Sequence, residues 1–78
     1  MNYGKAFKEI RDEQGLSRTE VAKLLGCTPS ALSKIERGKT HPKPQTIEAF
    51  CLFMRIPIAR FYFEAFTRED FESIDPIR

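Results

Sequence analysis

Few residues of this 78-residue chain are suited to catalysis. There is one histidine, His41, and there are two isolated cysteines, Cys27 and Cys51. A metal site needs more ligands at tighter spacing, and no Ser/His/Asp or Cys/His arrangement is readable around a single histidine. A glycine-rich phosphate loop is also missing from the sequence. We therefore expect no enzyme and no cofactor, and two buried thiols rather than a disulfide.

Charged side chains point instead to binding. Residues 1–43 contain nine Lys/Arg and five Asp/Glu, so their formal charge is +4, whereas residues 44–78 contain four and six, which gives −2. Arg37, Lys39 and Lys43 form a basic run. Such a run is either a solvated surface or part of a face that binds an anion.

Hydrophobic spacing and capping residues predict the elements that carry these side chains. Ser17 with Glu20 forms a capping box, Thr28 is a good N-cap, and Pro29 suits a first helical position. No segment alternates with period two, so we predict an all-α bundle of five short helices. They are expected within residues 2–15, 16–26, 28–37, 44–56 and 58–66, with Pro57 as the break before the last of them. Residues 67–78 form a polar tail with a short extra helix that ends before Pro76.

Two of the expected helices form a helix-turn-helix unit over residues 17–38. Ala22 must be small so that the second helix can cross the first closely. Gly26 lets the backbone adopt positive φ at the turn. The shared core is then filled by Cys27, Leu32 and Ile35.

Residues 16–42, LSRTEVAKLLGCTPSALSKIERGKTHP, resemble the lambda-repressor-like DNA-binding domains of the Cro/cI or XRE type. The similarity extends more weakly over residues 4–63, and the length also resembles the small controller proteins of restriction–modification systems. It implies a five-helix domain with a short C-terminal extension. It further implies a transcriptional regulator, repressor-like, that binds a palindromic operator as a homodimer through a recognition helix at 28–37. The residues on which the resemblance rests are Ser17, Glu20, Ala22, Gly26, Leu32, Ser33, Ile35, Glu36, Gly38 and Pro42.

The resemblance also assigns base contacts in the major groove. The matching positions are Pro29, Ser30, Ser33 and Lys34, at the start of a helix that lies in the groove. Ser30 is able to donate to or accept from several bases, and Lys34 reaches guanine or, equally well, a phosphate. The alternative for Ser30 and Ser33 is plain helix surface. Pro29 departs from the hydrogen-bonding residue common in the family, so specificity must depend more on the other three residues and on DNA shape.

Phosphate contacts are expected on both sides of this helix. Thr28 lies at a helix N-terminus, where backbone amides favour anions. Arg18 occupies a position where the family usually has glutamine, which puts the usual link from that side chain to the recognition helix in doubt. The remaining expected phosphate contacts are Arg37, Lys39 and Lys43.

Two positions have structural rather than DNA-binding interpretations. Arg11 and Glu36 match a pair of family positions that often form an ion pair between the first and third helices. A carboxylate beside phosphates would be repelled, which also favours a positioning role for Glu36. Arg55 stands where the family often has glycine, so we expect the turn after the fourth helix to differ from the usual one.

Aromatic residues are concentrated near the C-terminus, and they exceed what one face of a short helix can bury. Exposed apolar patches of this kind mark interfaces. We expect a homodimer, with residues 1–66 as the DNA-binding domain and 67–78 as a tail that completes the interface. The alternative is that the tail folds back and covers the patch. The expected interface residues are Leu52, Tyr62, Phe63, Phe66 and Phe71.

The leading hypothesis is thus a sequence-specific regulator whose partners are double-stranded DNA and a second copy of the chain. The alternative is an antitoxin or another protein-interaction module with the same fold. No apolar run approaches the ~20 residues of a membrane span, and the N-terminus lacks the apolar stretch of a signal peptide. We therefore expect a cytoplasmic protein without a membrane or a small-molecule ligand.

Overall fold

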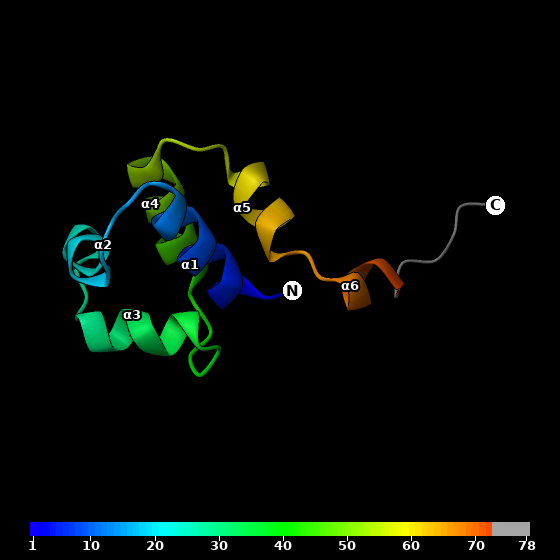
Figure 1. The fold of residues 1–78 in the computed structure, drawn as a ribbon, viewed down its shortest axis with the longest axis horizontal. Helices are drawn as coiled ribbons and strands as arrows, with labels where there is room; N and C mark the ends of the chain where they lie inside the picture. Colours follow the sequence, from blue (N-terminus) through cyan, green and yellow to red (C-terminus); the bar gives the residue numbers. More distant parts are fainter. Residues whose placement is uncertain (73–78) are drawn as a thin grey trace.

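Six helices and no strand make up residues 1–72, the part of the chain that the computed structural model describes (Figure 1). The all-α class and the five expected helices are confirmed. A sixth short helix follows in the tail, while Pro76, before which it was expected to end, lies outside the described residues. The helices are α1 (Tyr3–Glu13), α2 (Arg18–Leu25), α3 (Pro29–Glu36), α4 (Pro44–Met54), α5 (Ile58–Ala65) and α6 (Arg68–Glu72).

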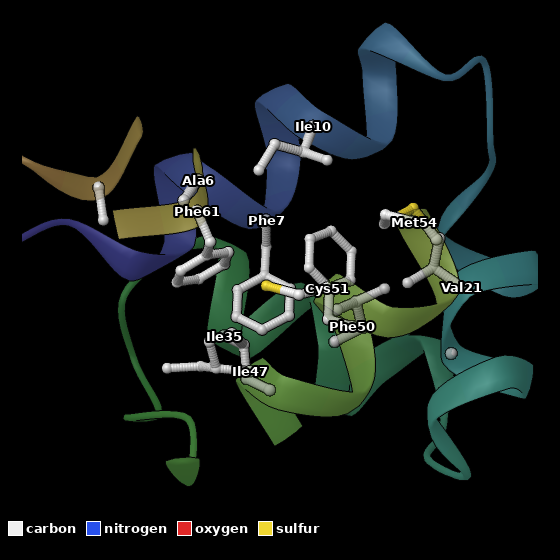
Figure 2. Packing of buried hydrophobic residues seen from close by; sticks show 13 residues of the cluster. Ala6, Phe7, Ile10, Val21, Ile35, Ile47, Phe50, Cys51, Met54 and Phe61 are labelled. Atoms are coloured by element: carbon white, nitrogen blue, oxygen red, sulfur yellow. The ribbon is translucent and has the colours of Figure 1, made fainter. Parts of the chain in front are cut away.

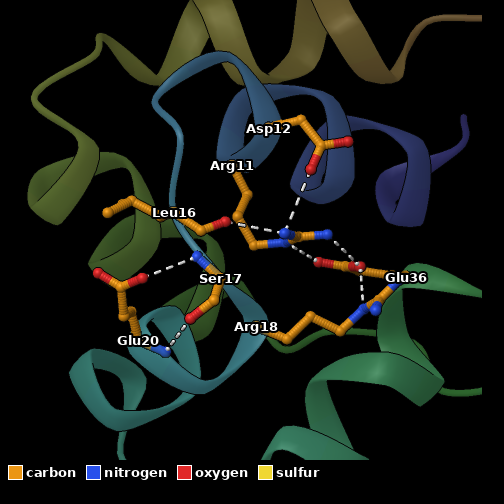
Figure 3. Close-up of polar contacts among 7 residues, drawn as sticks. All are labelled: Arg11, Asp12, Leu16, Ser17, Arg18, Glu20 and Glu36. Atoms are coloured by element: carbon orange, nitrogen blue, oxygen red, sulfur yellow. Dashed lines mark hydrogen bonds and ion pairs between the residues drawn. The ribbon is translucent and has the colours of Figure 1, made fainter.

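Local hydrogen bonds start helix α2 where the sequence predicts. Ser17 Oγ accepts a hydrogen bond from the Glu20 backbone N–H at 3.1 Å, and the Ser17 N–H donates to Glu20 Oε1 at 3.1 Å (Figure 3). The hydrogen bond from the Ser17 N–H to the Glu20 carboxylate, and then the Ser17 side chain, lower the pKa of Glu20 because they favour its ionised form. The capping box is therefore confirmed, and it sets the direction in which α2 leaves the preceding loop.

The core is built around three phenylalanines from three helices. Phe7, Phe50 and Phe61 are fully buried, and their ring centroids lie 4.5 to 6.0 Å apart (Figure 2). Such tilted and edge-to-face pairs add to the stabilisation from area burial alone. The cluster joins α1, α4 and α5, and α2 and α3 extend it through Val21, Ala22, Leu32 and Ile35.

Helix α1 passes very close to the end of α3. A Cβ atom added at Gly4 would lie 2.5 Å from the backbone carbonyl oxygens of both Ile35 and Glu36. Real side-chain atoms essentially never approach backbone that closely, so this crossing needs glycine. The need for glycine at position 4 is not readable in the sequence, because it arises only once two distant segments pack together.

The turn between α4 and α5 contains Arg55 and Pro57, the two residues singled out in the sequence. Arg55 itself adopts a left-handed conformation, with φ of 57°, so the turn has the backbone geometry that glycine favours. Helix α4 ends at Met54 and α5 begins at Ile58 with Pro57 as its N-cap residue, so Pro57 lies in the break before α5, as expected. Hydrogen bonds from the Arg55 N–H to Leu52 O at 3.2 Å and from the Ile56 N–H to Cys51 O at 3.0 Å satisfy the last carbonyls of α4.

Helix α6 projects to one side of the bundle formed by the other helices (Figure 1). The Asp70 N–H donates to Thr67 Oγ1 at 3.2 Å and the Thr67 N–H donates to Asp70 Oδ2 at 2.8 Å, which starts the helix with a reciprocal cap. No residue of α6 is buried. The helix therefore contributes little to the core of the domain.

Candidate nucleic-acid interface

Helices α2 and α3 form a tightly turned pair. Gly26 ends α2 with φ of 73°, and the Cys27 N–H donates to Ala22 O at 2.9 Å across the turn. Ala22 is fully buried, as expected of a small residue at the crossing. Leu32 and Ile35 are buried on the inner side of α3. Apolar contacts thus hold α3 on one side and leave side chains on its other side exposed.

Thr28 and Pro29 begin α3 as the sequence predicts. Thr28 Oγ1 accepts a hydrogen bond from the Ala31 N–H at 3.0 Å, and Pro29 occupies the first turn. Both residues are exposed. The Thr28 oxygen serves as the cap, and its hydroxyl hydrogen stays available for donation to a phosphate.

The outer side of α3 carries the four residues expected to face bases. Pro29, Ser30 and Lys34 are exposed, and Ser33 is half-buried. Their spacing along the helix places them on one face, opposite the buried Leu32. Within residues 1–72, no ion pair engages Lys34. The structure therefore brings all four together on an accessible polar surface.

The basic run after α3 lies in a loop that packs back on the domain. The Gly38 N–H donates to Ile35 O at 3.0 Å, and the Lys39 N–H donates to Lys34 O at 2.9 Å. The His41 ring meets the Tyr3 ring edge-on, with centroids 5.0 Å apart, and this is a role for His41 that the sequence did not predict. The loop is thereby held next to α3. Its three basic residues are exposed and form no ion pair with described residues: Arg37, Lys39 and Lys43.

Arg11 and Glu36 form the ion pair that the resemblance implies. Arg11 Nε donates to Glu36 Oε2 at 2.8 Å and Nη2 donates to Oε1 at 3.2 Å, while Nη1 donates to Leu16 O at 2.9 Å (Figure 3). The Glu36 side chain is 2% exposed and that of Arg11 is 8% exposed. The hydrogen bonds to Glu36 raise the pKa of Arg11, although burial acts in the opposite direction. The pair joins the last turn of α1 to the last residue of α3.

Arg18 also reaches Glu36, which the sequence analysis missed. Its Nε donates to Glu36 Oε1 at 2.9 Å, so α2 and α3 are linked through this side chain (Figure 3). Arginine at this position thus provides its own link between α2 and the last residue of α3. The Arg18 side chain remains 46% exposed. Eighteen residues separate the partners, so no local spacing rule could have revealed the contact.

The aromatic residues gather at α5 and α6. An open apolar pocket of about 300 Å³ is lined by Ala59, Tyr62, Phe63, Phe66 and Phe71. Phe66 and Phe71 contact each other with centroids 4.4 Å apart, so the tail does fold back in part. Phe63 and Phe71 nevertheless remain 73% and 64% exposed. We call these five residues the aromatic patch.

Not every expected interface residue belongs to this patch. Leu52 is 77% exposed, but it lies on α4 and does not line the pocket. Tyr62 is half-buried because its ring packs edge-on against Tyr3 and Phe61. Ala59, which the sequence analysis did not name, lines the pocket one turn of α5 before Phe63. The exposed face of α5 is therefore the better defined candidate surface.

The two cysteines and possible metal ligands were also located in the structure. Cys51 is buried, Cys27 is half-buried, and both are free thiols whose pKa burial raises. Within residues 1–72, no group of three or more His, Cys, Asp or Glu residues is arranged to hold a metal ion. No helix in that part of the chain is long and apolar enough to cross a membrane.

A small turn between α2 and α3, a buried inner face and an exposed polar outer face define a helix-turn-helix domain. The model of the helix-turn-helix family HTH_3 matches residues 7–61. The chain belongs to this family, which is the lambda-repressor-like, Cro/cI and XRE type that its sequence resembles.

Known proteins with similar sequences include regulators from bacteria and a phage. The HTH-type transcriptional regulator PuuR of Escherichia coli K12 is 38% identical over 61 residues, which cover 78% of this chain and 33% of PuuR. The cryptic phage CTXphi transcriptional repressor RstR of Vibrio cholerae is 28% identical over 76 residues, which cover 97% of this chain and 68% of RstR. The chain thus spans about a third of the length of PuuR.

A solved structure has the same fold. The clp gene regulator ClgR of Corynebacterium glutamicum aligns with a TM-score of 0.78 and 25% sequence identity, over 82% of this chain and 83% of that structure. This similarity agrees with the all-α, lambda-repressor-like class expected from the sequence.

Proposed function

We propose that the protein is a sequence-specific transcriptional regulator that inserts α3 into the major groove of double-stranded DNA. One observation carries this proposal: α3 is fixed by buried Leu32 and Ile35, while the side chains on its outer face are exposed or half-buried and form no ion pair with residues 1–72. A helix placed in the groove in this way reads bases with the residues of its first turns. The names of PuuR, RstR and ClgR as regulators support the same interpretation.

Base recognition is assigned to the outer face of α3. Lys34 donates to guanine O6 or N7, and Ser30 and Ser33 donate to or accept from base edges. Pro29 has no donor, so it contributes apolar contact to a thymine methyl group. The remaining specificity comes from the shape and deformability of the DNA.

Phosphate contacts are assigned to the flanks of α3. Thr28 and the amides at the start of the helix bind one phosphate. The exposed cations of the following loop, Arg37, Lys39 and Lys43, bind others, and so does the exposed part of Arg18. These contacts give affinity and a strong dependence on salt without reading sequence.

A homodimer is proposed through the aromatic patch and Leu52, with residues 1–66 as the DNA-binding domain and 67–78 completing the interface. The exposure of Phe63 and Phe71 supports it, because apolar patches of this kind usually lie in contact surfaces. Two copies of α3 would then read two half-sites roughly 34 Å apart on a palindromic operator. The protein acts in the cytoplasm and needs no cofactor for this activity.

Selection of bound duplexes from a random pool at moderate salt tests the proposal. We expect enrichment of a palindrome whose half-sites are about 10 base pairs apart. If no sequence is enriched, the regulator proposal fails.

The second candidate is an antitoxin or protein-interaction module, which the open apolar pocket at Phe63 and Phe71 favours. It gains support if the chain enriches no DNA site and remains a monomer.

A further inference from the structure

Glu36 supplies one carboxylate to two guanidinium groups. Arg11 uses all three of its side-chain nitrogens within the domain, two of them on Glu36. Arg18 uses only Nε, on Glu36 Oε1. Among the described residues, the two terminal nitrogens of Arg18 have no hydrogen-bond partner. Arg11 pairs with Asp12 Oδ1 as well, at 3.2 Å, whereas Arg18 shares Glu36 with Arg11 and, among residues 1–72, has no second acidic partner.

We propose that Glu36 is a positioning residue for DNA binding, which holds Arg18 by Nε so that its two terminal nitrogens face a phosphate. This inference rests on the proposed function, in which Arg18 contacts the DNA backbone. It assigns a task to Glu36 beyond the ion pair with Arg11. Arg18 lies at the first position of α2 and Glu36 at the last position of α3, so the contact also ties Arg18 to the recognition helix.

Fixing Arg18 in advance favours binding for an entropic reason. A free arginine loses rotamer freedom when it contacts a phosphate, and that loss weakens the complex. The bond from Nε to a side chain that is only 2% exposed removes much of this freedom when the domain folds. The planar guanidinium then presents a second edge for a bidentate phosphate contact.

The hydrogen-bond geometry argues against the opposite interpretation, in which Glu36 withholds Arg18 from DNA. The carboxylate already receives two hydrogen bonds from Arg11, which is buried and has no other acidic partner of comparable burial. Glu36 is therefore shared between two arginines, and Arg18 holds it through one nitrogen only. Because the bond uses Nε alone, Arg18 is able to keep it while its terminal nitrogens bind a phosphate.

A double-mutant cycle tests the proposal. The four proteins are wild type, Arg18→Gln, Glu36→Gln and the double variant, and the readout is the affinity for a random-sequence duplex at several salt concentrations. We expect Glu36→Gln to weaken binding by about three- to tenfold when Arg18 is present and to cause no such loss in the Arg18→Gln background. The loss of one negative charge in Glu36→Gln acts in both backgrounds, so it cancels from the comparison. Equal effects in the two backgrounds would overturn the proposal.

A second variant keeps the test valid where Glu36→Gln does not fold, since that change leaves Arg11 buried without its partner. Arg18→Lys leaves the pair of Arg11 and Glu36 intact and retains the charge. Its ammonium group has three donors on one atom but no planar fork, so it cannot hold Glu36 by one edge and present a second, bidentate edge to a phosphate. We expect Arg18→Lys to bind three- to tenfold more weakly than wild type with an unchanged unfolding midpoint. Binding equal to wild type would show that charge alone suffices, which overturns the proposal.

The matched control is Arg68→Gln. Arg68 has a 92% exposed side chain on α6 that pairs with Glu72 and not with Glu36, so removing its charge should leave the coupling between Arg18 and Glu36 unchanged. The outcomes also separate the two proposals. If wild-type protein binds no duplex, the proposed function fails and Glu36 loses its role with it. If wild type binds and the cycle is additive, only the positioning role fails.

Discussion

Lys34 lies one helical turn after Ser30 on the exposed face of α3. We expect Lys34→Ala to reduce the preference for the selected operator over random duplex by about 1 kcal/mol, the lower end of the range for a good base contact. Titrations of both duplexes under the same salt conditions measure this preference. An equal loss on operator and random DNA would reassign Lys34 to a phosphate, the alternative that its sequence position left open.

Lys39 lies in the loop after α3 and has no acidic partner among residues 1–72. We expect Lys39→Ala to weaken operator and random duplex alike and to lower the slope of log affinity against log salt by about 0.9, the value for one lost phosphate contact. The slope is obtained from affinities at four or more salt concentrations. An unchanged slope would place Lys39 on a solvated surface away from DNA.

Gly4 is the tightest point between two elements, α1 and the end of α3. We expect Gly4→Ala to reduce the free energy of unfolding by about 2 kcal/mol, since the new methyl group meets backbone rather than a flexible side chain. Urea unfolding followed by circular dichroism measures the change. Lys5→Ala is the control on the next, exposed residue, and it should stay within about 0.5 kcal/mol of wild type. Equal stability of Gly4→Ala and Lys5→Ala would show that α1 shifts without cost.

Arg55 carries a strained backbone at the end of α4. An L-residue in the left-handed conformation costs roughly 1–2 kcal/mol, and glycine avoids this cost but loses more chain entropy on folding. We therefore expect Arg55→Gly to raise the free energy of unfolding by about 0.5–1 kcal/mol. Arg55→Ala, which removes the side chain and retains the strain, should give no gain. Similar stabilisation by both variants would trace the effect to the side chain and not to φ.

The boundary between what the sequence could and could not predict follows sequence distance. Ser17, Glu20 and Thr28 act on neighbours three residues away, so their caps follow from local spacing. The contact of Arg18 with Glu36 and the bond from Gln14 Nε2 to Met54 O at 2.8 Å connect residues 18 and 40 positions apart. Nothing in local propensity encodes such pairs, because they exist only after the helices pack.

At the scale of the whole molecule, the inner and outer faces were predictable to different degrees. The buried stripe of α4 followed from helical spacing, and all of its expected residues are buried: Ile47, Phe50, Cys51 and Met54. Surface residues carry no such periodic signal, so the sequence could not separate Leu52 from the aromatic patch. It also left undecided whether the tail covers that patch. The packing of Phe71 on Phe66 leaves Phe63 open, which makes a second molecule the better candidate to cover it.

Phe63 offers the sharpest test of the dimer because its 73% exposed side chain contributes little to folding. We expect Phe63→Glu to produce monomers in light scattering while the helical circular dichroism stays unchanged, since a symmetric interface would bring two added carboxylates together in an apolar pocket. Leu24→Glu is the matched control, with a 44% exposed residue on α2 that does not line the pocket, and it should remain dimeric. A monomeric wild type, or a dimeric Phe63→Glu, would remove the aromatic patch as the interface. Loss of dimer together with loss of operator binding at low protein concentration would link the patch to the reading of two half-sites.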